Sequence, residues 1–480
     1  MARPRNRPRS ARLPARRRAA DHHASGAGSR PWHTLALRLA LALCVGIGIG
    51  VGALAGPALA IDFGAARSPL DPATHARVVE IMAHYYNFEF AEAERQARAL
   101  RDRSPGDPVG HFLLAEACWW QVINRPDLDR CLAEFDEAAR ETIRLGEERL
   151  ERDKRDPLAL FFLAGAYGRR AILAGLGGNH LEAVQASLTA RKYLQRLRKY
   201  HPEYDDAYFG LGLYDYYAAQ LPWFARVIGK VFLGLAGNRE RGIEELERAA
   251  SNGLFTQVEA RIFLAIVYLD EEQRYDEALA ILKELNAYYP DNLDYYGMLA
   301  FAYRTQDDHL NALRMLETLA RRGADSPAFG ARSRGLARYF LGSTYKVAGQ
   351  YARALPELDR AVDLAGGGDT NWLLAIALLE RGRVHDLLGE RAAAVADYEQ
   401  VLALRDFRDA HDRAESYVAS PYTVPPEEMA DHLTDEAVEQ MLLTLGDAGA
   451  HGTASGETAA ADTDSLVAPA LDGSSAQRPD

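Results

Sequence analysis

The sequence has 480 residues, which is too long for one ordinary globular core and corresponds to about three compact domains unless the chain is built from repeats. With 48% hydrophobic and 26% charged residues, the composition is typical of a folded soluble protein that favours helix. The net charge is −12, but residues 1–60 hold ten Arg and one Asp, which leaves 46 Lys and Arg against 67 Asp and Glu in residues 61–480. An acidic body of this kind argues against nucleic acid as a partner.

Residues 1–60 have the organisation of a secretory signal. The first 38 residues are rich in Arg, residues 39–54 are apolar and uncharged, and the small residues Ala58 and Ala60 follow a Gly-Pro break. This order predicts export, with cleavage after Ala60. If the segment is not cleaved, it is long enough to remain as a single N-terminal membrane anchor.

Two cysteines, Cys118 and Cys131, remain after this segment, and export would place them in an oxidising compartment. We expect them on the two helices of one hairpin, where a disulfide is geometrically possible; the alternative is two small buried hydrophobic side chains. Two cysteines without neighbouring His pairs lack the usual four-ligand spacing of a zinc site. The sequence therefore predicts no metal and no cofactor.

In the second half of the chain, small and aromatic residues recur at an interval of about 34 residues. The positions are clearest in residues 340–365, and similar ones occur in 257–290, 291–323 and 371–404. In the clearest unit the positions are Gly342, Tyr345, Gly349, Ala354, Leu358 and Ala361. Apolar residues at i, i+3, i+4 and i+7 in each half-unit indicate two amphipathic helices. The small residues would let these helices approach closely, so the pattern indicates packing rather than chemistry.

The pattern resembles the tetratricopeptide repeat. The resemblance implies an all-α, right-handed α-solenoid of about eight antiparallel helix pairs. We divide the chain into residues 1–60 (basic arm and signal or anchor), 61–256 (divergent pairs with insertions), 257–405 (regular array), 406–445 (an extension with one helix over 426–445) and 446–480 (a disordered tail).

In this family the first helix of each pair lines a concave groove that binds peptides. Carried over to this sequence, the groove positions are Phe209, Leu213, Tyr216, Tyr217, Phe301, Arg304, Tyr339, Ser343, Lys346, Leu379 and Arg383. Aromatic side chains near cations suit a partner segment with apolar anchors and an acidic group. The family's Lys and Asn clamp for a terminal carboxylate is not reproduced, and Tyr216, Tyr217 and Tyr339 have a second interpretation as residues buried between units.

Residues 221–237, LPWFARVIGKVFLGLAG, form an apolar insertion that is too short and too interrupted by charge to span a bilayer. Three interpretations compete: an extra core helix that caps the groove, a partner-binding patch, and a membrane-surface contact through Trp223 and Phe224.

No nucleophile elbow, phosphate loop or clustered pair of acids occurs in the sequence, so we predict no catalytic residue and no enzymatic activity. We expect a non-catalytic scaffold of the cell envelope, periplasmic or envelope-associated, that binds a protein or peptide in the groove. The alternative is a membrane-anchored assembly factor whose insertion at 221–237 contacts the bilayer or a membrane protein, with membrane contact also through the N-terminal segment.

Overall fold

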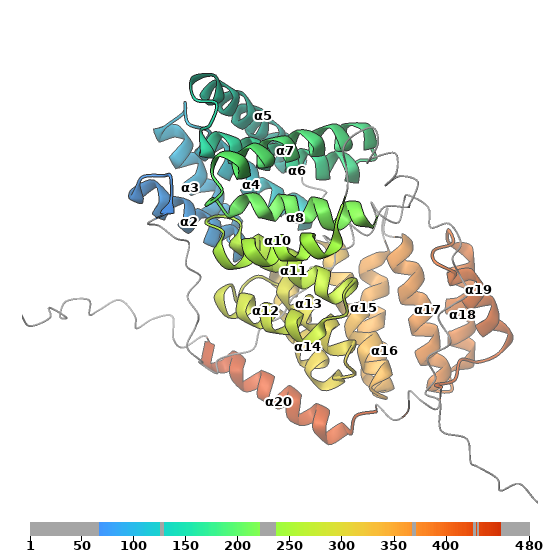
Figure 1. The fold of residues 1–480 in the computed structure, drawn as a ribbon. Helices are drawn as coiled ribbons and strands as arrows, with labels where there is room; N and C mark the ends of the chain where they lie inside the picture. Colours follow the sequence, from blue (N-terminus) through green and yellow to red (C-terminus); the bar gives the residue numbers. More distant parts are fainter. Residues whose placement is uncertain are drawn as a thin grey trace, which may run out of the picture.

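The structure is a computed structural model that describes residues 67–124, 129–220, 237–366, 371–425, 429 and 432–452. Within these residues every regular element is helical (Figure 1). The predicted cleavage site at Ala58 and Ala60 lies outside the described residues, and so do Trp223 and Phe224 of the insertion.

Eight helix pairs follow one another along the described part of the chain, and the two helices of each pair pack against each other. They are α2 (Pro72–Tyr86) with α3 (Phe90–Arg103), α4 (Pro108–Asn124) with α5 (Asp129–Arg152), α6 (Pro157–Leu176) with α7 (His180–Tyr200), α8 (Asp206–Ala219) with α10 (Arg239–Asn252), α11 (Gln257–Asp270) with α12 (Tyr275–Tyr288), α13 (Asp294–Arg304) with α14 (His309–Asp325), α15 (Ala331–Val347) with α16 (Tyr351–Ala365), and α17 (Asn371–Leu387) with α18 (Arg391–Ala403). The predicted all-α solenoid is confirmed.

Close approach within the pairs depends on the small residues of the repeat pattern. A Cβ atom added to Gly342 in α15 would lie 2.6 Å from Cγ of Leu358 in α16. The same addition at Gly382 in α17 would lie 2.5 Å from the ring of Tyr398 in α18. Since such distances are well inside van der Waals contact, these positions serve packing, as the pattern indicated.

In the six pairs whose turn the structure describes, the turn contains a residue in the left-handed region, which in the third pair is Gly178 with φ of 78°. Gly349 and Gly389 fill this place with φ of 78° and 79° in the last two pairs. Phe88, Gln273 and Asp307 fill it in three other pairs, with φ of 65°, 54° and 58°. A residue with a side chain pays about 1–2 kcal/mol for this conformation. The turn therefore does not require Gly, which is why the repeat is harder to recognise where Gly is missing.

The C-terminal extension differs from the prediction of one helix over 426–445. It contains two helices, α19 (Ala410–Ala419) and α20 (Asp435–Gly452). The second helix begins at Asp435, where Thr434 Oγ1 accepts a hydrogen bond of 3.3 Å from the Ala437 amide and so caps its first turn. It extends into the tail that was expected to be disordered, and it packs against α14 (Figure 1).

The first helix pair lies against the turn between α12 and α13, about two hundred residues further along the chain. The Asn292 side chain donates a hydrogen bond of 2.7 Å to the Tyr86 carbonyl, and the Asp291 amide donates one of 3.0 Å to the Asn87 side chain. The rings of Tyr86 and Tyr289 are 5.6 Å apart. The first half of the solenoid is thus closed on itself, and side chains fill its inner face.

A buried ion triad joins three helices of this inner face. Arg169 of α6 donates from Nε and NH2 to Glu116 of α4, at 2.9 and 2.8 Å, and from NH2 to Glu259 of α11. The exposed fractions of these side chains are 11%, 2% and 6%. The guanidinium also lies over the Trp119 ring, 5.0 Å from its centre. The triad therefore fixes how the second, third and fifth pairs meet.

Among the described residues, α6 is the one helix long and apolar enough to span a membrane by length and composition. Half of its most apolar window is buried inside the protein, and the helix carries Arg169 of the triad. We therefore interpret α6 as a core helix.

Replacing Arg169 by Met should lower the free energy of unfolding by about 3–5 kcal/mol, because two buried carboxylates lose their cation. Urea unfolding followed by circular dichroism measures the change. Arg144→Met is the control, since Arg144 pairs with Glu141 and Glu148 at the surface and its loss should leave the midpoint almost unchanged. Adding Glu116→Gln and Glu259→Gln to Arg169→Met should recover part of the loss; equal stability of Arg169→Met and wild type would contradict the role of the triad.

Glu259 should make the stability depend on pH. Burial raises its pKa to about 7 against the opposing effect of Arg169, whereas the ordinary value is 4.5. Between these two values the folded state retains a proton that the unfolded state has released, so the contribution of Glu259 to stability falls as pH rises from about 4.5 to about 7. The difference in unfolding free energy between wild type and Glu259→Gln should follow this fall. A difference that does not vary with pH would contradict it.

Candidate partner-binding site

The predicted groove residues of α8 lie in the core. Phe209 and Tyr216 are 8% and 0% exposed. Phe209 packs on Phe263 with ring centres 5.6 Å apart, and the Tyr216 hydroxyl donates to Glu272 at 2.8 Å. Leu213 and Tyr217 are half-buried against the same core. The closed first half thus gives Phe209 and Tyr216 a packing role, which is the second interpretation that the sequence left open for Tyr216.

The predicted groove residues of the second half, in contrast, meet around one carboxylate, that of Glu380 in α17. Lys346 of α15 lies 2.9 Å from Glu380 Oε1, and Ser343 Oγ donates to the same oxygen at 3.2 Å. Arg383 NH1 donates to Glu380 Oε2 at 2.9 Å. These side chains come from the first helices of two successive pairs, so the repeat itself brings them together.

Aromatic rings surround the cations of this group. The guanidinium of Arg383 lies 5.1 Å from the ring centres of Tyr417 and Tyr422, and its NH2 donates to the Tyr417 hydroxyl at 2.9 Å. The Lys346 ammonium lies 5.2 Å from the Tyr422 ring. Both tyrosines come from the C-terminal extension, α19 and the segment after it. The extension thus forms a wall of the site.

Arg304 and Tyr339 complete the group, which we call the Glu380 cluster: Arg304, Tyr339, Ser343, Lys346, Glu380, Arg383, Tyr417 and Tyr422. The Arg304 guanidinium lies 5.7 Å from the Phe340 ring, and among the described residues it has no ion pair. Burial, and next the Glu380 charge, raise the pKa of Tyr339 to about 12. Phe301 lies one helical turn before Arg304 and is 37% exposed.

The charges of the Glu380 cluster do not balance. Burial opposes ionisation of Glu380, but Lys346 and Arg383 lower its pKa to about 2, so it is a carboxylate at neutral pH. It faces three cations, Arg304, Lys346 and Arg383. The Arg383 Nε atom is buried and donates no hydrogen bond within the described residues. An ionised acid held by two cations is a poor proton donor or base, so the arrangement suits binding of an anionic group rather than catalysis.

The sequence pattern identified the residues of α13, α15 and α17 but missed Glu380, Tyr417 and Tyr422. Glu380 precedes Arg383 by one turn, the spacing of an ion pair on a helix, and this was the available signal. Tyr417 and Tyr422 lie after the last repeat, where no periodicity exists to place them. Leu379, also named as a groove position, is 6% exposed and lies in a smaller core between α17, α18 and α19.

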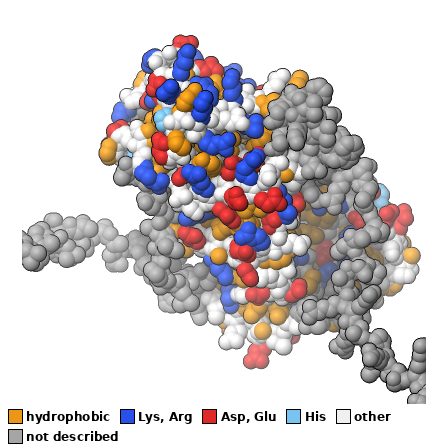
Figure 2. Space-filling view, viewed as in Figure 1, with side chains coloured by type: hydrophobic (Ala, Val, Ile, Leu, Met, Phe, Trp, Pro, Cys, Tyr) orange, Lys and Arg blue, Asp and Glu red, His pale blue; other side chains and the backbone are white. Residues whose placement is uncertain are grey.

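Figure 2 shows basic and acidic side chains intermixed over the face that Figure 1 presents, with acidic ones gathered near its middle. An extended nucleic-acid interface would need a basic band along the surface. The face shown is therefore unlike such an interface, in agreement with the acidic charge of residues 61–480.

Residues 269–334 match the tetratricopeptide repeat family. No curated protein matches the sequence. Among solved structures, the APC/C hetero-tetramer Cut9–Hcn1 is similar at 14% identity over 68% of this chain and 52% of that chain, with a TM-score of 0.44, so this chain spans about half the length of that one. A tetratricopeptide repeat protein from Parabacteroides merdae is similar at 12% identity over 72% of this chain and 100% of that chain, with a TM-score of 0.27. Yeast Tom70 is similar at 12% identity over 79% of this chain and 96% of that chain, with a TM-score of 0.30.

These overall likenesses are weak, so the assignment depends on the matched residues and on the helix pairs themselves. The match begins at the end of α11 and ends in α15, and it includes the pair α13 and α14. Stacked helix pairs of this kind are scaffolds for protein–protein interaction. Residues 269–334 thus match the tetratricopeptide repeat, and the described helix pairs before and after them have the same helix-pair fold.

Proposed function

We propose that the protein is a scaffold that captures an acidic segment of a partner protein at the Glu380 cluster. The observation that carries this proposal is the excess of cations there: Arg304, Lys346 and Arg383 surround a single carboxylate. An acidic side chain of a partner would pair with Arg304 and balance the charge. The partner's apolar side chains would rest on Phe301 and Tyr339, which are partly exposed beside it.

An acidic segment of a partner would be attracted only near the Glu380 cluster. Residues 61–480 carry a large excess of acidic residues, so most of the surface repels an acidic segment. A positive site on an acidic body favours one orientation of the partner and penalises others, which provides specificity more than raw affinity. The attraction should weaken with added salt.

Arg304→Gln should weaken binding of acidic peptides by about tenfold, which corresponds to about 1.4 kcal/mol, and should leave thermal stability unchanged because Arg304 has no ion pair to lose. The probes are fluorescent peptides that share one aromatic anchor and differ in having acidic, neutral or basic flanks, titrated at low and high salt. Wild type should prefer the acidic peptides, most strongly at low salt.

Arg332→Gln is the matched control for this experiment. Arg332 is also an Arg of a first helix, and its guanidinium lies 5.3 Å from the Trp372 ring, but it contacts no member of the Glu380 cluster. The control should bind like wild type. Equal binding of all three peptides, or full binding by Arg304→Gln, would disprove the proposed site.

We also propose that residues 1–60 place the protein in the cell envelope, either released after cleavage behind Ala60 or anchored by the apolar segment 39–54. Fractionation of cells that make the native chain should find it in the soluble envelope extract if it is cleaved. Pelleting that resists carbonate would indicate the anchored form, and recovery with cytoplasmic proteins would contradict export.

A further inference from the structure

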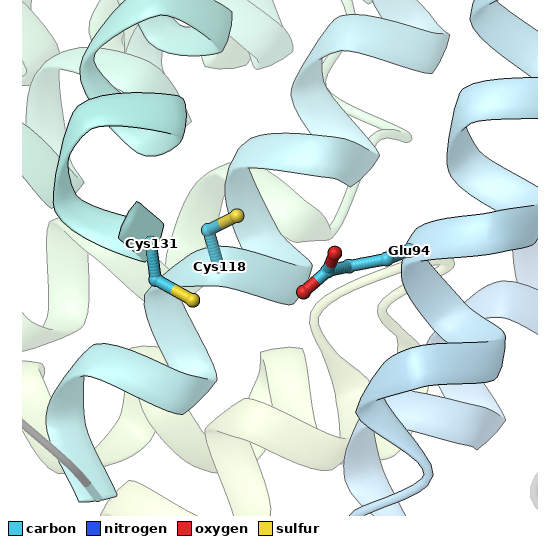
Figure 3. A group of neighbouring side chains, drawn as sticks. All are labelled: Glu94, Cys118 and Cys131. Carbon is cyan, nitrogen blue, oxygen red and sulfur yellow. The ribbon is translucent and has the colours of Figure 1, made fainter. Parts of the chain in front are cut away.

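Three side chains from three helices meet in the first half of the solenoid. Glu94 of α3, Cys118 of α4 and Cys131 of α5 are all buried, and each offers one ligand atom within 4.8 Å of the others. Figure 3 shows the Glu94 carboxylate extending from α3 toward the two cysteines. The predicted hairpin of the two cysteines is thus observed, and both residues are free thiols. The spacing of the cysteines in the sequence gave no indication of Glu94, which lies on the preceding helix pair.

A fourth possible ligand, Glu134, lies beside this group. It follows Cys131 by one turn of α5, and Cys118 Sγ donates to its Oε2 at 3.7 Å. Thiolate sulfur and carboxylate oxygen are both ligand types of Zn²⁺, so the two cysteines and two glutamates offer four ligands, of which Glu134 would have to move closer to the other three. Ligand atoms around tetrahedral zinc lie about 3.5 Å apart at bond lengths of about 2.0–2.3 Å, so modest rotation of the side chains would close the site.

The charges around the group permit a divalent cation. Glu94 accepts from Arg130 at 3.2 Å and from Arg98 at 3.1 Å, and Glu134 pairs with the same two arginines. The negative charges of the two carboxylates are already balanced by the positive charges of the two guanidiniums. A divalent cation that replaces the protons of both thiols adds no net charge, so its burial avoids the large cost of an unpaired ion.

We infer that Glu94, Cys118 and Cys131, with Glu134 as the fourth ligand, form a binding site for a thiophilic divalent cation, best matched by Zn²⁺. Thiolate ligands select such cations over Mg²⁺ and Ca²⁺, which prefer oxygen. The Arg130 side chain is 61% exposed, so it can move away from Glu94 Oε1. This oxygen would keep the hydrogen bond that it accepts from Gln121 at 2.6 Å and would offer its second lone pair to the metal. The bound ion would join α3 of the first pair to both helices of the second.

The alternative for this thiol pair is a disulfide. The Glu94 carboxylate offers an oxygen within 4.8 Å of both sulfur atoms. A bound cation would use this carboxylate and would stabilise both thiolates, whereas a disulfide gains nothing from it. The arrangement therefore favours a metal over a disulfide.

The test uses the full chain, reduced and stripped of metal with a chelator, and titrated with Co²⁺ and then Zn²⁺. We expect one Co²⁺ per chain, a thiolate-to-cobalt charge-transfer absorption in the near ultraviolet, and its loss when Zn²⁺ displaces Co²⁺. An indicator dye should register the release of about two protons per Zn²⁺ bound. The midpoint of thermal unfolding should rise with Zn²⁺ concentration.

Substitutions of single residues test which side chains bind the metal. Cys131→Ser should abolish the charge-transfer absorption, and Glu94→Gln, which keeps the shape of the side chain, should weaken Zn²⁺ binding by at least about tenfold. Cys44→Ser is the control, since Cys44 is the third cysteine of the chain and lies far from the group in sequence; it should bind like wild type.

Three results would overturn the inference: absence of stoichiometric binding, binding that survives both Cys131→Ser and Glu94→Gln, or mass spectrometry of the unreduced native chain that finds Cys118 bridged to Cys131. If Cys131→Ser loses its helical circular dichroism, proton release by the native chain and the Glu94→Gln titration decide the question by themselves.

Discussion

Arg169 crosses the inside of the first half of the solenoid and holds two glutamates from helices that are remote in sequence. An open superhelix would leave these three side chains in water, where their pairing would contribute little. Closure buries them, and a buried guanidinium must then be paired or it is strongly destabilising. The triad is therefore compatible with one arrangement of the second, third and fifth pairs. This constraint, together with the contact of Tyr86 and Asn87 on the turn after α12, fills the space where a groove would otherwise lie.

Closure of the first half gives the two halves different roles. In the first half the inner aromatic residues, such as Tyr216, serve the core, and a partner has no access to them. In the second half the first helices bring Arg304, Lys346 and Arg383 around Glu380, with Lys346 itself buried and Phe301 exposed one turn before Arg304. The extension supplies Tyr417 and Tyr422 to the same place. The last repeat and the extension thus form one surface, although the repeat pattern ends between them.

The repeat pattern predicted what depends on neighbours in sequence. Gly342 and Leu358 are in contact because the two helices of a pair must approach closely, and this is visible as spacing. The pattern could not predict closure, since Tyr86 and Asn292 belong to different pairs and nothing in their local sequence indicates contact. For the same reason the groove positions of α8 and α15 looked equivalent, yet Tyr216 is in the core and Lys346 is in the Glu380 cluster.

The triad and the Glu380 cluster also have net charges of opposite sign, and this difference has a chemical consequence. The triad has one cation for two carboxylates, and the excess can be relieved by a proton on Glu259, whose pKa burial raises to about 7. The Glu380 cluster has three cations for one carboxylate, and arginine does not lose its proton in a protein. A proton taken up from water by Glu259 can therefore neutralise the excess negative charge of the triad. The second half can be balanced only by an anion from outside, which is the physical reason to look for the partner there.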